Sequence, residues 1–124
     1  MKITALVLLT SLALGPAAAQ ATDISGVWQV STSIAQAPVV LDCSILQVGV
    51  RLTGWCEPET ADARPVALTG ALDRTQATWG YDIDVQGQPI HLAYQGTLNA
   101  DSLGMTGALS YGGGVAAGLT AIRK

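Results

Sequence analysis

Met105-Thr106-Gly107-Ala108-Leu109 is one of four variants of a short pattern in which a glycine interrupts a strand-like segment. The other three are Leu52-Thr53-Gly54-Trp55, Leu68-Thr69-Gly70-Ala71-Leu72 and Tyr94-Gln95-Gly96-Thr97-Leu98. Glycine weakens the interior of a strand unless the sheet bends sharply or another backbone comes close. A sheet that closes into a small barrel needs such a bend in several strands. The repeated glycine therefore predicts a small, closed antiparallel β-barrel.

Apolar and polar residues alternate along most of the chain after residue 22, and no segment there has a helical period. The clearest alternation is in the fifth expected strand, where one face carries Ala77, Trp79, Tyr81, Ile83 and Val85. A period of two with one apolar face is typical of half-buried antiparallel strands. We expect eight strands, at residues 24–31, 39–48, 51–57, 66–73, 75–85, 89–98, 103–111 and 115–123.

The expected connections are short, which favours an up-and-down meander over a fold with long crossings. The sequence therefore predicts an all-β fold: a single eight-stranded antiparallel up-and-down β-barrel at residues 22–124. In a meander the connections alternate between the two ends of the barrel. The loops at 32–38, 58–65, 86–87 and 112–114 should share one end, which we expect to be the mouth because it has the longer loops. The termini should lie at the other end.

The first twenty residues have the layout of a secretory signal peptide. Met1-Lys2 is a short positive start, residues 3–14 are mostly apolar, and Ala17-Ala18-Ala19 supplies small residues after Gly15-Pro16. We expect a signal peptide at residues 1–19, with cleavage after Ala19 or after Ala21. The mature protein should be periplasmic or secreted. No cysteine sits at the cleavage site, so no membrane anchor is expected.

The charge of the chain argues against two classes of partner. The whole chain has a net charge of −3, and removal of Lys2 with the signal peptide leaves five basic and nine acidic residues, a net charge of −4. An acidic chain with few, scattered cations lacks the electrostatic footprint of a protein that binds nucleic acid or anionic membranes.

No pattern of catalytic or metal-ligating residues stands out. His91 is the only histidine, and we expect it on the outer face in solvent, so a transition-metal site is not expected. Asp82 and Asp84 share an outward face, but no loop supplies the further oxygens that calcium needs. No serine is paired with a base in a recognised motif. We therefore expect no metal, no cofactor and no enzymatic activity.

The two cysteines are expected to form a disulfide, because export places them in an oxidising compartment. A two-residue turn at Gly49-Val50 sets a register that places Cys43 opposite Cys56. Counting outward from this turn, the two cysteines form a non-hydrogen-bonded pair, in which the Cα atoms come closest. The expected bridge is structural and stabilises the domain by about 3 kcal/mol on the chain-entropy model.

The two ends of the mature chain carry a family resemblance. Gly26-Val27-Trp28 opens the first expected strand, and Arg123 ends the last. This pattern resembles the calycin superfamily of lipocalin-like barrels, in which a tryptophan of the first strand packs against an arginine of the last strand. The resemblance implies that Trp28 and Arg123 close one end of the barrel through a cation–π contact.

Two groups within this superfamily are similar in part. The Leu-Thr-Gly motifs at 52–54 and 68–70 resemble strands of the avidin-type biotin binders, but the later strands here lack the tryptophans that line that family's pocket. Size, export and a single disulfide resemble the periplasmic inhibitors of secreted bacterial metalloproteases. Those proteins insert an N-terminal arm into the protease, whereas few residues precede Ile24 in the mature chain expected here.

The inward faces are almost wholly apolar, and eight strands enclose a space that side chains fill or that holds one small ligand. Both possibilities stay open from the sequence. The candidate ligand-binding residues are three inward tyrosines and three apolar neighbours, Tyr81, Tyr94, Tyr111, Trp79, Ile83 and Leu92. The tyrosine hydroxyls either receive a ligand or bond to one another and to the backbone. The sequence thus favours a binding module for a small apolar or amphipathic molecule.

A second hypothesis is a protein-binding module, such as an inhibitor of an exported protease or an envelope interaction partner. Trp55 falls on the outward face, and Leu46 and Val48 face outward on the paired strand. The acidic turn at 57–62 lies nearby in the sequence. Three clustered apolar side chains can form a surface for a partner. In either case we expect a monomer.

Overall fold

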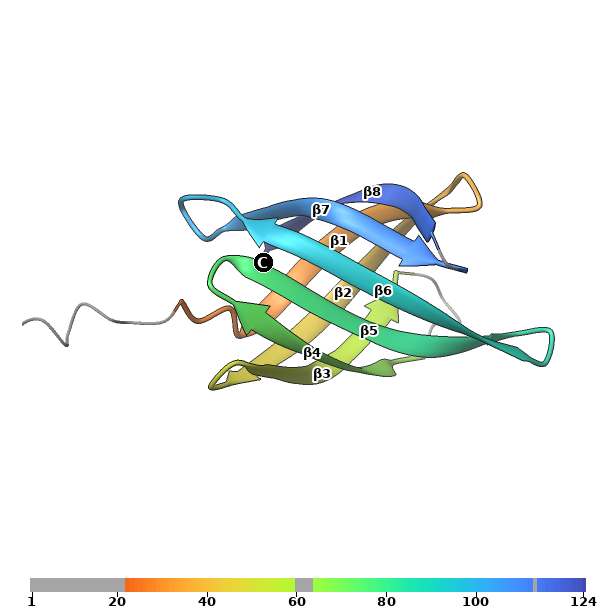
Figure 1. Ribbon diagram of the computed structural model, residues 1–124, viewed down its shortest axis with the longest axis horizontal. Coiled ribbons are helices and arrows are strands. Elements are labelled where there is room, and N and C mark those ends of the chain that lie inside the picture. The colour runs from red at the N-terminus through yellow and green to blue at the C-terminus, as the bar shows by residue number, and fades with distance from the viewer. Residues whose placement is uncertain (1–21, 60–63, 113) are drawn as a thin grey trace, which may run out of the picture.

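The chain folds into one closed barrel of eight antiparallel strands, in which each strand pairs with the next and β8 pairs with β1 (Figure 1). The computed structural model describes residues 22–59, 64–112 and 114–124. The expected signal peptide, and Asp62 of the acidic turn, lie outside these residues. The described ranges contain no helix long and apolar enough to cross a membrane. The strands are β1 (Gly26–Ile34), β2 (Ala37–Val48), β3 (Arg51–Pro58), β4 (Val66–Asp73), β5 (Gln76–Val85), β6 (Gln88–Leu98), β7 (Gly104–Tyr111) and β8 (Gly114–Arg123).

The predicted fold class, strand number and meander order are confirmed, and two local predictions are wrong. The expected loop at 32–38 is a two-residue turn at Ala35 and Gln36, with β1 and β2 running up to it. Both residues have positive φ, 52° and 68°, as the tight turns of two-residue hairpins require. Neither is glycine or asparagine, so no residue of this turn indicates it in the sequence. Leu103, expected to begin the seventh strand, precedes β7 and is 56% exposed.

The predicted pairing of the cysteines is confirmed. In the β2–β3 register Cys43 is opposite Cys56, and the two form a disulfide with a Cα–Cα distance of 4.0 Å. Gly49 has a positive φ of 66° in the connecting turn. Both cysteines are buried in the barrel interior. The bridge therefore ties β2 to β3 from the inside of the wall.

Three of the four repeated glycines are required because a neighbouring backbone comes too close for a side chain. A Cβ at Gly54 would lie 1.8 Å from the carbonyl oxygen of Ser44, and one at Gly107 would lie 1.8 Å from that of Gln95. A Cβ at Gly70 would lie 2.0 Å from the carbonyl oxygen of Thr78. Gly96 differs, because only the flexible side chain of Met105 lies near its missing Cβ. The tight coiling of the sheet therefore depends on glycine at three of these positions.

We predict that Gly107→Ala lowers the free energy of unfolding by about 2–4 kcal/mol, because the methyl group must push a backbone carbonyl aside. Gly96→Ala is the matched control in the adjacent strand, and it should cost clearly less because the methionine side chain can move. Denaturant unfolding of both variants measures the difference. Equal losses for the two variants would contradict the close-approach explanation.

One end of the barrel is closed by the first and last strands. Trp28 is fully buried and its Nε1 donates to the carbonyl oxygen of Ile24 at 2.9 Å. The Arg123 guanidinium lies over the Trp28 ring, 4.7 Å from its centroid. The same guanidinium donates from Nη1 to Ser25 O at 2.8 Å and from Nη2 to Asp23 O at 3.1 Å. The contact that the family resemblance implied is therefore present, and it also holds the segment that precedes β1.

We predict that Trp28→Ala and Arg123→Ala are not additive, because each removes the same contact. A double-mutant cycle measured by denaturant unfolding should give a coupling of about 1–2 kcal/mol. Arg123→Lys keeps the charge but not the planar group, and it should recover only part of the loss. A coupling indistinguishable from zero would show that the two side chains close the barrel independently.

Candidate functional site

The inward-facing side chains differ between the two ends of the barrel. At the end that receives the termini they are fully buried, including Ile24, Leu52, Met105 and Ala121. At the opposite end they are only partly buried, and most are apolar or aromatic. This partly exposed set, which we call the mouth ring, comprises Ile34, Val39, Val66, Ile83, Ile90 and Tyr111. The predicted mouth is thus the end at which the interior reaches solvent.

An aromatic cluster lies one layer below the mouth ring. Trp79 and Tyr94 are opposite each other in the β5–β6 register, and their rings are stacked with centroids 5.4 Å apart. The ring centroids of Tyr81 and Tyr94 are 5.5 Å apart, and the two rings are inclined by 37°. Leu92 is opposite Tyr81, and Ile83 is opposite Ile90 in the mouth ring. Five of the six predicted ligand-binding residues therefore form one continuous surface on β5 and β6.

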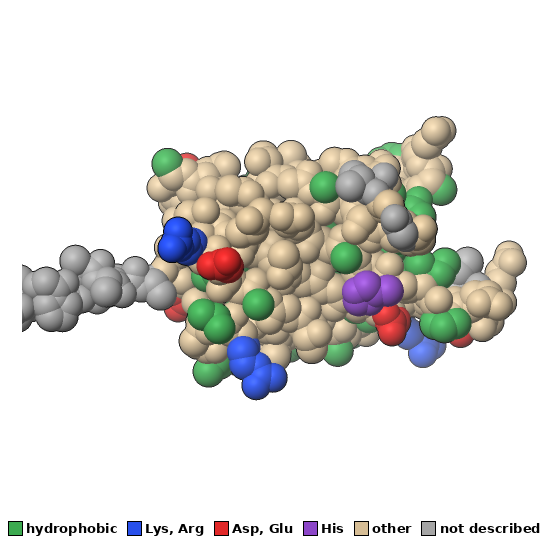
Figure 2. Space-filling view, viewed as in Figure 1, with side chains coloured by type: hydrophobic (Ala, Val, Ile, Leu, Met, Phe, Trp, Pro, Cys, Tyr) green, Lys and Arg blue, Asp and Glu red, His purple; other side chains and the backbone are tan. Residues whose placement is uncertain are grey.

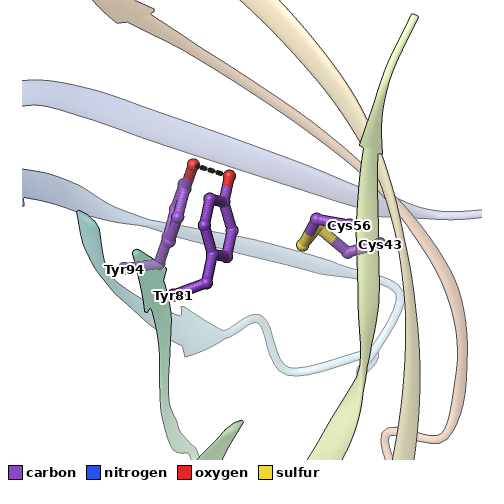
Figure 3. Close-up of a disulfide and its surroundings, with 4 residues drawn as sticks. All are labelled: Cys43, Cys56, Tyr81 and Tyr94. Carbon is purple, nitrogen blue, oxygen red and sulfur yellow. Dashed lines mark hydrogen bonds between the residues drawn. A yellow bond between two sulfur atoms is a disulfide. The ribbon is translucent and has the colours of Figure 1, made fainter. Parts of the chain in front are cut away.

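The hydroxyl groups of Tyr81 and Tyr94 are joined by a hydrogen bond of 2.6 Å (Figure 3). The two side chains point the same way from their strands, and the disulfide lies on another part of the wall. Burial raises the pKa of Tyr81, and burial beside Tyr81 raises the pKa of Tyr94. Both groups therefore stay protonated at neutral pH. One of their two protons makes the mutual bond, which leaves the other available to an acceptor.

The indole N–H of Trp79 is a buried donor with no partner among the described residues. The side chain is only 3% exposed, so solvent does not satisfy it. An unsatisfied buried donor costs about 1–3 kcal/mol. Sequence reasoning placed Trp79 inside as an apolar lining residue and missed this donor. The sequence could have indicated this unpaired donor, because the inward faces carry few side chains that accept a hydrogen bond from an indole N–H.

Tyr111 does not join the aromatic cluster. It lies in the mouth ring, next to a register shift in β7 between Leu109 and Ser110. Its hydroxyl accepts a hydrogen bond from the backbone N–H of Ala35 at 3.1 Å. The tyrosine thereby ties the end of β7 to the β1–β2 turn. Its place is at the rim of the interior, where it limits the width of the mouth.

Two adjoining hollows lie on the outer face of the sheet, where sequence reasoning expected only solvated side chains. Their volumes are about 370 and 500 Å³, and both are lined by His91, Ala93 and Ser110. His91 Nδ1 lies 2.7 Å from the carboxylate of Asp82. In Figure 2 the histidine, in purple, stands beside an acidic side chain on a face that otherwise shows few charges. The His91 side chain is 66% exposed, as expected.

The first outer hollow is lined mostly by small residues, together with Trp79 and Tyr94 of the aromatic cluster. The imidazole of His91 lies across Gly80, where a Cβ would come 3.1 Å from Cε1 and Nε2. Ala93, Ala108, Thr69 and Gln95 also line this hollow. These side chains are neutral and mostly short. The hollow is open, and the described residues contain no group of three or more potential metal ligands here or elsewhere.

The predicted partner surface is exposed. Trp55 is 51% exposed, Leu46 is 56% exposed and Val48 is 66% exposed. In the register of the sheet, Trp55 is opposite Ser44, which is in turn opposite Val27, another partly exposed apolar residue. The surface therefore spans the outer face of β1, β2 and β3, away from the outer hollows on β4 to β8.

Comparison with known proteins supports the architecture alone. No family model matches the sequence, and no curated protein matches it. Among solved structures, a redesigned β-barrel, mFAP1, bound to DFHBI, is similar with a TM-score of 0.58. The match covers 82% of this chain and 94% of that chain, at 16% sequence identity. Identity this low shows a shared barrel fold.

Proposed function

We propose that this protein is an exported, non-enzymatic binding barrel of the calycin type, which takes a small apolar or amphipathic molecule into its interior through the mouth ring. The observation that carries this proposal is the asymmetry of the interior. One end is fully buried, whereas the other exposes a ring of apolar side chains directly above an aromatic cluster with unused hydrogen-bond donors.

The mouth ring supplies the apolar surface whose burial would drive ligand binding. Ile83 and Ile90 face each other across β5 and β6, and Val39 and Val66 stand on other strands of the wall. Covering such side chains with an apolar ligand removes surface from water on both partners, worth about 0.8 kcal/mol for each buried CH₂ of the ligand. Binding pockets in proteins are mostly apolar with a few placed polar groups, and this end of the barrel has that composition.

Three further features support the calycin and export parts of the proposal. The meander order is that of an up-and-down barrel, and the Trp28–Arg123 contact closes one end. The disulfide is the kind of bond that persists in an oxidising compartment. The similar redesigned barrel was solved with a small molecule bound, which is compatible with a barrel of this shape accepting one.

We predict that the protein binds the neutral dye Nile red, and that Ile83→Asn weakens this binding by at least tenfold, because it places an amide in the mouth ring. Leu46→Asn is the matched control on the outer face and should leave the affinity unchanged. Fluorescence titration gives both affinities. Native mass spectrometry of protein purified from its own compartment should also show a bound small molecule.

Two results would contradict interior binding. One is an equal loss of dye affinity in both variants. The other is the absence of dye binding together with a single apo mass in the native spectrum.

The exposed surface of Trp55, Leu46 and Val48 supports protein binding as a second candidate function. Exposed apolar residues that adjoin across strands are typical of interaction sites when they form a patch. We predict that Trp55→Asp abolishes capture of a specific partner in pull-downs from envelope extracts. Leu103→Asp, at an equally exposed apolar residue in the β6–β7 turn, is the control and should keep the partner. Capture of the same proteins by both variants would remove this surface from consideration.

A further inference from the structure

The aromatic cluster below the mouth ring contains a buried hydrogen-bond donor that has no partner among the described residues. This group is Trp79 Nε1–H, which can donate but not accept. Tyr81 and Tyr94 share one hydrogen bond and bring two O–H groups to it. Because Trp79 is stacked on Tyr94, the indole belongs to the same cluster as the hydroxyl pair. Within this cluster the indole N–H is therefore the group that needs an acceptor.

The same interior offers no counter-charge. Apart from tyrosines and tryptophans, no residue with a polar or charged side chain is among the buried residues that the structure describes. The guanidinium of Arg123 is at the closed end, where it donates to the backbone carbonyls of Ser25 and Asp23 and covers Trp28. An ionised group in an apolar interior is costly unless it is paired. A ligand with a carboxylate head would have to bury that charge without a cation.

From this unpaired indole donor and from the absence of a cation among the described interior residues, we infer that the interior ligand is a neutral molecule with an apolar body and a carbonyl-type oxygen, which accepts a hydrogen bond from Trp79 Nε1–H. This inference rests on the proposed function and narrows its ligand class. Burying the acceptor satisfies a donor that otherwise has no partner, so ketones, esters and amides should be preferred over fatty acids of the same length and over plain hydrocarbons.

Indole N–H signals in ¹H–¹⁵N NMR spectra test this directly with 2-nonanone, nonanoate and nonane as probes. The chain has three tryptophans, so three signals are expected, and Trp79→Phe identifies the one of interest. Trp28 is an internal control, because its Nε1 already donates to Ile24 O. The ketone should move the Trp79 signal strongly and leave the Trp28 and Trp55 signals in place. Nonane should bind without the hydrogen-bond shift, and nonanoate should bind most weakly.

Affinities for Trp79→Phe complete the test, because phenylalanine keeps an aromatic ring but removes the N–H. The variant should lose about three- to tenfold more affinity for the ketone than for nonane, the value of one net hydrogen bond. The inference is overturned if the ketone binds without moving the Trp79 signal, if nonanoate binds most tightly, or if ketone and nonane lose affinity equally. If none of the three probes perturbs the interior, interior binding of apolar molecules itself fails, and the inference fails with it.

Discussion

The close approach of neighbouring strands at a few glycines is the constraint on which the rest of this structure depends. The carbonyl oxygens of Ser44 and Gln95 occupy the space that a Cβ would need at Gly54 and Gly107. A sheet of eight strands can coil tightly enough to meet its own first strand only where such contacts are allowed. Closure removes both free edges and separates the side chains into an inside and an outside. The disulfide, the closing tryptophan and the aromatic cluster all follow from that separation.

Closure also makes the two ends of the barrel unequal. The Arg123 guanidinium covers Trp28 and bonds to the segment before β1, so the chain seals the end at which it begins and finishes. At the other end a two-residue turn at Ala35 and Gln36 joins β1 and β2. Tyr111 bonds to that turn but does not cover the interior. The apolar side chains of the mouth ring therefore remain partly exposed. The described side chains thus close one end of the barrel more completely than the other.

The outer face offers a second, different environment. The imidazole of His91 lies next to Gly80, and its Nδ1 contacts Asp82. Most of the side chains that line the hollows beside it are short and neutral. The interior is apolar with unused donors, whereas this face is open and polar at its edges. The contrast explains why we place the ligand inside. An apolar molecule that covers the mouth ring removes more apolar surface from water than one that lies over alanine and glycine on the outer face.

The sequence by itself determined the barrel, its eight strands, the opposite placement of Cys43 and Cys56, and the apolar inward faces. These properties depend on period-two alternation and turn lengths, which are local and can be read along the chain. It also indicated which inward residues would be aromatic. The β1–β2 turn was not predictable, because positive φ at Ala35 and Gln36 is imposed by the paired strands on either side and not by the turn residues themselves.

Only the tertiary structure decided which polar groups in the interior find partners. Tyr81 and Tyr94 come from adjacent strands and reach each other, and Tyr111 reaches a backbone group of another hairpin. Trp79 reaches no partner in the part of the chain that the structure describes. Hydrogen bonds depend on distances of a few tenths of an ångström between residues far apart in the chain. Alternation along a strand fixes which side of the wall a residue faces, but the coiling of the whole sheet fixes what that residue meets there.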